Sequence, residues 1–318
     1  MKQGVATMNR RRFVAISAAA LGAAIAGLPY DARADLPPPT RWHGVALGAE
    51  ASITLRHPQA ERIIESCVAE IERLENIFSL YRGGSALSRL NADGRLDAPP
   101  FELLELLGQC GVLNAATGGL FDPTVQPLWA AYAAAFAGGQ EPGAEALARA
   151  LERVGWPGVS AEPGRIQFSR PGMALTLNGI AQGYIADRVA ALLRAEGLTD
   201  VLVNTGELRA LGGHPDGGAW PVTFNDGSGG PSGSMDLRDA ALASSAPLGT
   251  AFDAEGRVGH IFDPRSGRPA APGWRLVSVV ARSAALADGL STAFCLMSRE
   301  EIERTLAHFP DAWLAHLA

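Results

Sequence analysis

The stretch from residue 58 to residue 80 carries its apolar side chains at helical spacing. In PQAERIIESCVAEIERLENIFSL, one face holds six apolar residues: Ile63, Ile64, Cys67, Ile71, Leu74 and Ile77. This spacing predicts a long amphipathic helix, which must bury its apolar face against other elements. A chain of 318 residues with 47% hydrophobic composition can supply the core for it.

Helices and short strands alternate along the rest of the chain. We expect helices at 101–117, 144–154, 180–198 and 284–298. We expect strands at 220–224, 240–244 and 275–281, and a pair of strands around a turn within each of 164–177 and 200–213. Because no repeat or linker divides the chain, these elements predict a single α+β domain with a mixed, largely antiparallel sheet and flanking helices.

Residues 1–34 have the features of a twin-arginine export signal. They are Asn9, the pair Arg10 and Arg11, Phe13, an apolar run over 14–28, and Ala32-Arg33-Ala34 as a cleavage site. The apolar run is shorter than the roughly 20 residues that span a bilayer. We therefore expect cleavage and a periplasmic protein, residues 35–318, without stable membrane insertion; an uncleaved anchor is the alternative.

The charge of the mature protein excludes several classes of function. Loss of residues 1–34 leaves 22 basic and 32 acidic residues, which is a net charge of −10. An acidic chain of this kind is a poor ligand for nucleic acid or anionic lipid. No lysine follows residue 34, so Schiff-base chemistry and a P-loop lysine are also excluded.

The three cysteines, Cys67, Cys110 and Cys295, lack the spacing of metal ligands. Each lies in an apolar, helix-like run, so we expect buried and inert thiols. One disulfide is the alternative in an exported protein, and the sequence does not identify its partners.

Four segments carry residues suited to chemistry, and each also has an ordinary structural explanation. In TLNGIAQGYIADRV, Gly179 and Gly183 mark a helix start whose N–H groups at 179–181 could hold phosphate, or whose glycines simply allow close packing. In LADGLSTAF, Asp288 and Thr292 share one helix face, as ligands of a hard cation would, although capping gives the same spacing.

The other two segments place reactive or aromatic groups beside turns. In GHIFDPRSGRP, His260 precedes an Asp-Pro turn, either as a base or as a strand-end residue. In SLYRGG and GGLFDP, Tyr81 and Phe121 could hold a planar ring, and Asp122 could accept from a ribose hydroxyl. Core packing is the alternative for both aromatic residues.

The order of the motifs is more informative than any one of them. FSLYRGGSALSRLN, GGLFDPTVQPL, LNGIAQGYIADRV, NTGELRALG, SSAPLGTAF, HIFDPRSGRP and LADGLSTAF together resemble the ApbE family of FAD:protein FMN transferases. The resemblance runs from about residue 42 to residue 310. The export signal and the LNGIAQGY variant look most like NosX, the member associated with nitrous oxide respiration.

The resemblance implies a single α+β domain with FAD, the flavin donor, in a cleft, and Mg²⁺ as the cofactor. Such enzymes attach the FMN half of FAD to a Thr or Ser of a target flavoprotein and release AMP. For this chain, the expected partner is a membrane flavoprotein of nitrous oxide respiration.

Site residues follow from the same motifs. The dinucleotide would contact eight residues: Tyr81, Leu120, Phe121, Asp122, Thr176, Gln182, His260 and Ile261. Metal ligands would be the Gly179 carbonyl with Asp288 and Thr292. The catalytic residues would be Asp288, through the metal, and His260. Either His260 or an acidic neighbour would be the base that takes the hydroxyl proton.

Thr176 and Gln182 depart from the family pattern, which usually has Asp and Lys at these positions. The exchange leaves the net charge unchanged, but Gln cannot offset phosphate charge as Lys does. We therefore expect weaker activity or greater reliance on the metal. Two other functions stay open at this point: an FAD pyrophosphatase, which uses water as the acceptor, and a non-catalytic FAD-binding accessory protein.

Overall fold

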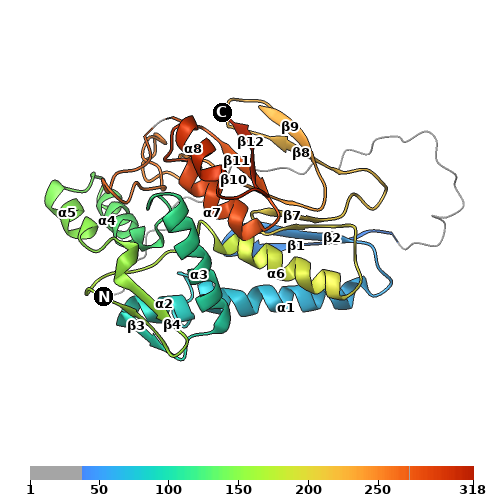
Figure 1. Ribbon diagram of the computed structural model, residues 1–318, viewed down its shortest axis with the longest axis horizontal. Helices are drawn as coiled ribbons and strands as arrows, with labels where there is room; N and C mark the ends of the chain where they lie inside the picture. Colours follow the sequence, from blue (N-terminus) through green and yellow to red (C-terminus); the bar gives the residue numbers. More distant parts are fainter. Residues whose placement is uncertain (1–37, 272) are drawn as a thin grey trace, which may run out of the picture.

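The computed structural model describes residues 38–271 and 273–318. The predicted signal peptide, residues 1–34, lies outside the described residues. A seven-stranded sheet forms the centre of the protein, with strand order β1-β2-β6-β7-β10-β11-β12 (Figure 1). Its strands are β1 (Thr40–Ala46), β2 (Ala49–Leu55), β6 (Val201–Asn204), β7 (Leu208–Leu211), β10 (Ala241–Ser245), β11 (Val277–Ala281) and β12 (Trp313–Leu317).

Three helices cover one face of this sheet. They are α1 (Ala60–Phe78), α6 (Ala181–Ala195) and α7 (Ala284–Phe294). α7 packs on β10 and β11, α6 packs on β7 and against α7, and α1 packs on β1 and against α6. The apolar face of α1, including Ile63, Cys67 and Ile71, is buried in the main core, as its spacing predicts.

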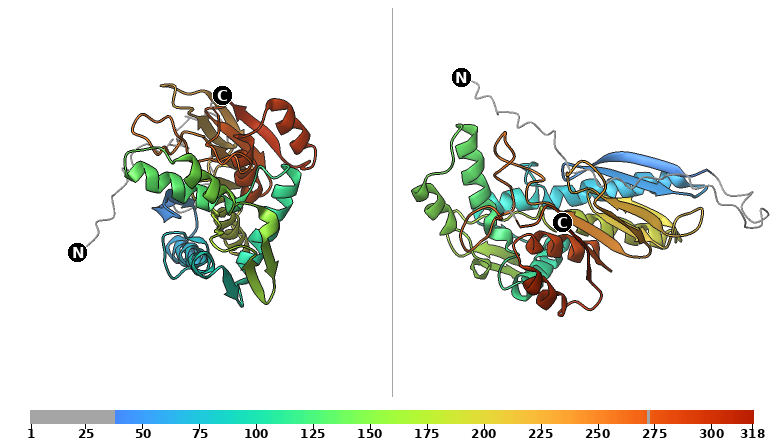
Figure 2. Two further views of the ribbon diagram at one scale, coloured as in Figure 1. Left: turned by 90° about the vertical axis from the view of Figure 1, so that its left-hand side faces the viewer. Right: turned by 90° about the horizontal axis from the view of Figure 1, so that it is seen from above.

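The opposite face of the sheet is partly covered by the hairpin of β8 (Trp220–Phe224) and β9 (Gly233–Leu237). Strand residues alternate between the two faces: Val201 and Val203 belong to the helix-side core, whereas Leu202 packs with Trp220 and Val222 of the hairpin. In the left view of Figure 2, the cyan α1 and the yellow α6 lie below the C-terminal end of the chain, which is at the top.

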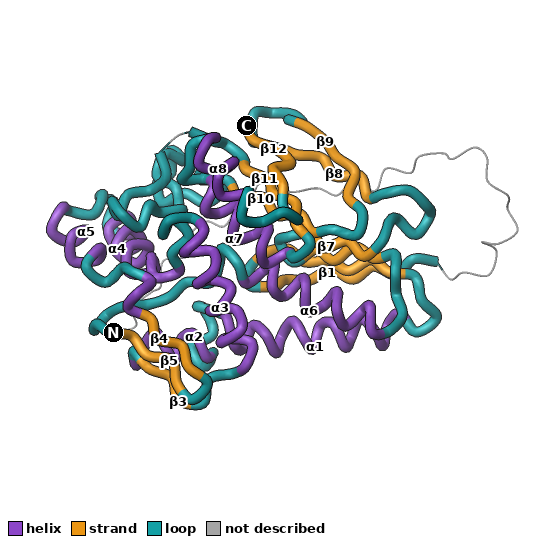
Figure 3. The backbone as a smooth tube through the Cα atoms, in the orientation of Figure 1, coloured by secondary structure: helices purple, strands orange, loops and turns teal. Residues whose placement is uncertain are grey.

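The remaining elements form one end of the molecule, at the left in Figure 3. They are α2 (Ala86–Asp93), α3 (Phe101–Ala116), α4 (Gln126–Ala137), α5 (Ala144–Leu151) and a small sheet in the order β3-β5-β4, with β3 (Arg95–Asp97), β4 (Val159–Glu162) and β5 (Arg165–Phe168). α8 (Arg299–Leu306) follows α7.

The α+β class and the largely antiparallel sheet are confirmed, and all pairings between the described strands are antiparallel. The three cysteines are free and buried, also as expected. Among the described helices, none is long and apolar enough to cross a membrane.

Two element predictions are wrong. Residues 173–177 form no strand, because the backbone of Leu175 pairs with the side chain of Asn91 and the Thr176 N–H donates to the Pro123 carbonyl at 2.8 Å. The helix expected over 284–298 ends at Phe294, because Ser298 and Glu301 form a capping box that starts α8.

Candidate active site

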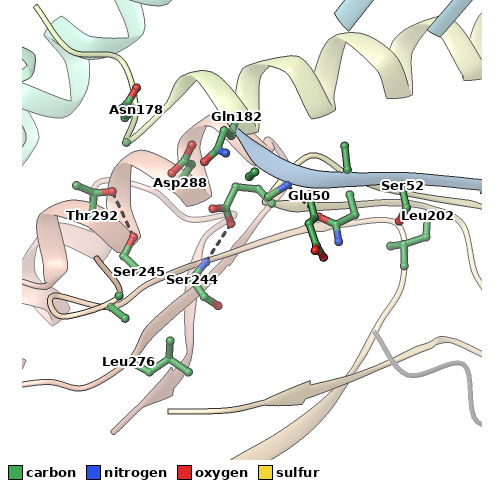
Figure 4. Close-up of a pocket in the computed structure, with 18 of the residues that line it drawn as sticks. Glu50, Ser52, Asn178, Gln182, Leu202, Ser244, Ser245, Leu276, Asp288 and Thr292 are labelled. Carbon is green, nitrogen blue, oxygen red and sulfur yellow. Dashed lines mark hydrogen bonds between the residues drawn. The ribbon is translucent and has the colours of Figure 1, made fainter. Parts of the chain in front are cut away.

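A cavity of about 1280 Å³ opens where the start of α6, the body of α7 and the outer face of the sheet meet. Its lining contains ten of the eleven predicted site residues: Leu120, Phe121, Asp122, Thr176, Gly179, Gln182, His260, Ile261, Asp288 and Thr292. The fold therefore brings four motifs that are far apart in the sequence to one place. Figure 4 shows Asp288, Thr292, Gln182 and Asn178 gathered at one end of this cavity.

The glycines of the NGIAQG segment allow α6 and α7 to approach closely. A Cβ atom on Gly183 would lie 2.2 Å from the Ala284 carbonyl oxygen, and one on Gly179 would lie 2.9 Å from the Thr292 hydroxyl oxygen. Neither position has room for a side chain. The backbone of Gly179 consequently lies beside Thr292, as the proposed metal-ligand set requires.

The backbone N–H groups at the start of α6 are already engaged. Those of Ile180 and Ala181 both donate to the Leu177 carbonyl, at 3.1 and 2.8 Å, and that of Gly183 donates to Asp288 Oδ2 at 3.2 Å. The expectation that N–H groups at 179–181 hold phosphate is therefore wrong for Ile180 and Ala181. A tight turn before the helix takes up these donors.

Asp187, which the sequence analysis missed, fixes the start of α7. Its carboxylate accepts from the backbone N–H groups of Ala284 and Ala285 at 2.9 and 3.0 Å and from the Ser283 hydroxyl at 2.8 Å. Arg209 Nε lies 3.3 Å from the same carboxylate. A side chain of α6 thus caps α7, the helix that carries Asp288 and Thr292. An acid in mid-helix gives no sign of this role in the sequence.

Two buried carboxyl groups face the cavity, and only one of them was predicted. Asp288 and Glu207 are 3% and 6% exposed, and Glu207 Oε2 accepts from the Ser244 N–H at 3.1 Å. Burial raises the pKa of Asp288 to about 7. Burial and the nearby Asp288 charge raise the pKa of Glu207 well above its ordinary value. An acid directly after the Thr-Gly turn in NTGELRALG was the available signal for Glu207.

The Thr292 hydroxyl belongs to a short chain of hydroxyl groups. Ser245 Oγ, at the end of β10, lies 3.2 Å from Thr292 Oγ1 and 2.8 Å from Ser291 Oγ. The dashed line from Thr292 to Ser245 in Figure 4 marks one of these contacts. Ser245 was not predicted as a site residue, although it lies in the quoted motif SSAPLGTAF. The contact sets the side-chain orientation of Thr292.

The donor set at this end of the cavity suits a hard cation. Gly179 can offer a carbonyl, Asp288 a carboxylate and Thr292 a hydroxyl, and all three are the oxygen ligands that Mg²⁺ prefers. A cation there would also favour the charged forms of the two buried carboxyl groups. Within residues 38–271 and 273–318, no three His, Cys, Asp or Glu side chains gather as a metal site. The fit therefore depends on the hydroxyl and the carbonyl.

His260 lines the same cavity with a defined ring orientation. Its Nδ1 lies 3.0 Å from the Thr250 carbonyl oxygen, so Nδ1 carries the proton in the neutral ring and Nε2 is the acceptor. Burial lowers the pKa of His260 below its ordinary value, against the opposing effect of the Thr250 and Pro247 carbonyls. The ring is therefore neutral at pH 7 and able to accept a proton.

Asp122 lines the cavity, but its carboxylate serves the turn. Oδ1 accepts from the Thr124 N–H and hydroxyl at 2.8 and 2.6 Å, and Oδ2 accepts from the Trp156 N–H at 3.1 Å. Leu120 and Phe121 are 6% and 5% exposed. They form an apolar wall rather than an exposed stacking surface. This segment therefore shapes the cavity more than it supplies polar groups.

The two residues that depart from the family pattern both line the cavity. Gln182 is packed against the turn between β6 and β7, where a Cβ atom on Gly206 would lie 2.8 Å from Gln182 Nε2. The backbone carbonyl of Gln182 accepts from the Thr205 hydroxyl at 2.9 Å. The cavity lining is therefore neutral at these two positions.

Tyr81 is the one predicted site residue that does not line the cavity. It follows α1 in a turn held by Ser79, whose hydroxyl accepts from the Tyr81 N–H at 3.1 Å, and the residue is 65% exposed. A contact between Tyr81 and a flavin stays a prediction.

Comparison with known proteins agrees with the motif order. The chain matches the model of the ApbE family over residues 47–314. The FAD:protein FMN transferase of Treponema pallidum is 30% identical over 280 residues, which cover 80% of this chain and 77% of the relative. The transferase of the same name from Klebsiella pneumoniae is 25% identical over 282 residues, covering 84% and 78%.

Solved structures show the same fold. The ApbE flavinyl transferase of Pseudomonas stutzeri superposes with a TM-score of 0.75 at 28% identity, covering 88% of this chain and 91% of that one. The ApbE protein of Thermotoga maritima gives a TM-score of 0.76 at 24% identity, covering 88% and 94%. On the family match and the shared fold, this chain belongs to the ApbE family.

Proposed function

We propose that this protein is an FAD:protein FMN transferase that moves the FMN half of FAD to a hydroxyl group of a flavoprotein. The observation that carries the proposal is that Asp288, Thr292 and His260 all line one cavity. Family membership, and the names of the relatives, support the same activity.

The reaction replaces the phosphoanhydride bond between the FMN and AMP halves of FAD with a phosphate ester bond to the acceptor. The acceptor hydroxyl oxygen bonds to the phosphorus of the FMN half, and the bond from that phosphorus to the AMP oxygen breaks. The hydroxyl proton passes to Nε2 of His260, which the contact at Nδ1 leaves as an acceptor. AMP departs with the electron pair of the broken bond, and His260 then releases the proton to water.

We assign the metal site to the Gly179 carbonyl, the Asp288 carboxylate and the Thr292 hydroxyl. When bound there, Mg²⁺ would supply positive charge next to the diphosphate. Asp288 is held for this role by the Gly183 N–H at 3.2 Å, and Thr292 by Ser245 at 3.2 Å. Because Gln182 is neutral, we expect charge neutralisation to depend on this site more than in relatives with Lys at that position.

The proposal is tested by covalent labelling. The mature protein is incubated with FAD, Mg²⁺ and a purified flavoprotein domain that the Klebsiella pneumoniae transferase labels, with that transferase as the positive control. We expect flavin fluorescence on the acceptor band of a denaturing gel. Thr292→Val, which keeps the side-chain shape but removes the hydroxyl, should abolish most of the signal. An unlabelled acceptor, with FAD bound to the protein and the control active, would overturn the proposal.

We also infer where the protein acts and on what. The features of residues 1–34 support export by the twin-arginine route to the periplasm, and the NosX-like variant supports a membrane flavoprotein of nitrous oxide respiration as the acceptor. Deleting the gene should remove covalent FMN from that flavoprotein in membrane extracts. Changing Arg10 and Arg11 to Lys should retain the protein in the cytoplasm, and export despite this change would contradict the assigned route.

A further inference from the structure

The outer face of β2 extends the cavity away from the proposed metal site. Alternate residues from Ala51 to Leu55 are buried on the helix side of the sheet, whereas the intervening ones line the cavity. Ala49 and Ala51 also line the cavity, and the other lining residues of this segment are polar: Glu50, Ser52, Thr54 and Arg56. In Figure 4, Ser52 and Leu202 lie at the far end of the drawn lining from Thr292, and Glu50 lies between.

Residues near the β8–β9 hairpin form the other wall of this extension. We define the β2 groove by Ser52, Thr54, Arg56, Leu202, His214 and Trp220, all of which line the cavity. The hairpin packs on the sheet through Trp220 and Leu202 and leaves the cavity-lining residues of β2 partly exposed. The result is a groove with one polar wall and one wall anchored by an indole ring.

Two buried hydrogen-bond donors in this groove lack an acceptor. Among the described residues, Arg56 Nε and Trp220 Nε1 have no hydrogen-bond partner. Trp220 is 5% exposed, and its ring meets His214 edge-on at 4.6 Å between centroids. The other end of Arg56 is fixed by Asp216 at 3.0 Å. A buried donor without a partner is destabilising, so a ligand with acceptor oxygen atoms would gain affinity here.

The size of the cavity leaves room for a second substrate. Sites for single small ligands commonly measure roughly 300–1,000 Å³, and this cavity measures about 1280 Å³. A transfer reaction needs the acceptor hydroxyl within about 3–3.5 Å of the phosphorus. The acceptor segment must therefore enter the same cavity as FAD, and the β2 groove is continuous with the end that holds Asp288 and Thr292.

We propose that the β2 groove binds the extended polypeptide that flanks the acceptor Ser or Thr, with its backbone carbonyl groups accepting from Trp220 Nε1 and Arg56 Nε. Carbonyl oxygen atoms recur along any peptide and need no particular side chain. The inference rests on the proposed function, because only a transferase needs a protein substrate at this place.

The test separates acceptor binding from FAD binding. Trp220→Phe removes the indole N–H but keeps an aromatic ring, and the unpaired donor means that no internal hydrogen bond is lost. Arg62→Ala, which removes an arginine paired with Glu196 on the helix side of the protein, is the matched control for Arg56→Ala. For each variant we would measure the KM for the acceptor domain used in the labelling test, the Kd for FAD and the Tm.

We expect Trp220→Phe and Arg56→Ala each to raise the KM for the acceptor about tenfold, as the loss of one hydrogen bond gives. Their FAD Kd should stay within twofold of the wild-type value, and Arg62→Ala should change neither quantity. A weakened FAD Kd would overturn the inference, because the groove would then hold part of FAD. An unchanged acceptor KM would also overturn it. The wild-type protein is assayed first. If it labels no acceptor, the proposed function itself is refuted, and the variants are not needed to show this.

A bulky substitution provides a second test that does not depend on Trp220 packing. Thr54 lines the groove from β2, and Thr54→Trp should fill it. We expect loss of transfer to the acceptor domain while FAD binding is retained. Full transfer by Thr54→Trp, at a wild-type Tm, would contradict a peptide path along β2.

Discussion

Asp288 Oδ2 accepts a hydrogen bond from the backbone N–H of Gly183 at 3.2 Å, which joins the middle of α7 to the first turn of α6. The contact is possible because a glycine at position 183 lets the two helices touch. It gives one carboxylate a fixed orientation in a buried place. The precision of the site therefore depends on the packing of α6 against α7 as much as on the side chains themselves.

Gly179→Ala should disturb the proposed metal site directly. The new methyl group would lie 2.9 Å from Thr292 Oγ1, so Thr292 must move. We expect the Mg²⁺ concentration for half-maximal transfer to rise about tenfold, with little change in Tm. Gly108→Ala is the control, because a Cβ atom at that exposed position in α3 meets nothing within 4 Å. Equal Mg²⁺ dependence of the two variants would contradict the assignment of Gly179.

Asp187→Ala should loosen the start of α7. The change removes the acceptor for the Ala284 and Ala285 N–H groups and the ion pair with Arg209. We expect a loss of about 2–3 kcal/mol in the free energy of unfolding, measured in urea. Glu145→Ala removes a solvent-exposed ion pair on α5 and should cost less than about 0.5 kcal/mol. Similar losses for the two variants would show that Asp187 does not anchor α7.

His260 should set the acidic limb of the pH profile. Its pKa is lowered by burial, so the ring is protonated and inactive as a base only below the ordinary value of 6.5. At saturating Mg²⁺, kcat/KM should rise with pH through a pKa below 6.5 and stay level above about pH 7. His260→Gln should lower kcat by roughly 10²–10⁴-fold and remove this limb. A variant that keeps the wild-type profile would exclude His260 as the base.

Gln182→Lys tests the departure from the family pattern. A lysine there would place positive charge in the cavity, where this chain has a neutral amide. We expect tighter FAD binding and a severalfold lower Mg²⁺ requirement, more clearly when Thr176→Asp is added. Gln140→Lys, an exposed change beyond the end of α4, should alter neither quantity. An unchanged Mg²⁺ requirement in Gln182→Lys would mean that the neutral amide does not increase the dependence of the reaction on Mg²⁺.

The sequence predicts the helices that line the core better than the edges of the sheet. α1, α3 and α6 repeat apolar residues with clear helical spacing. β1, with the sequence TRWHGVA, is missed because it lacks the usual alternation of apolar residues. Arg41 and His43 lie on an exposed face, and Gly44 lies beneath the Trp42 ring. β12, at the other edge of the sheet, is equally inconspicuous. Edge strands depend on pairing, which a local pattern does not reveal.

The order of the motifs predicted several site residues. Residues whose role depends on a contact with a distant part of the chain were missed. Asp288, Thr292 and Gly179 came from the resemblance and lie together. Asp187 and Ser245 act through partners about 100 and 50 positions away in the chain, and no spacing rule finds such pairs. The backbone N–H groups of Ile180 and Ala181, expected to hold phosphate, instead donate within a local turn. The formation of this turn depends on backbone geometry rather than residue type.

The ratio of AMP released to FMN attached tests the central claim most directly. The mature protein is incubated with FAD, Mg²⁺ and the acceptor domain; AMP is measured by chromatography and attached FMN by the mass of the intact acceptor. We predict one AMP for each FMN attached, and neither product with Asp288→Asn, which removes the charge but keeps the side-chain size. AMP released with free FMN would indicate hydrolysis of FAD, and FAD bound without either product would indicate a carrier. Either result would contradict a transferase.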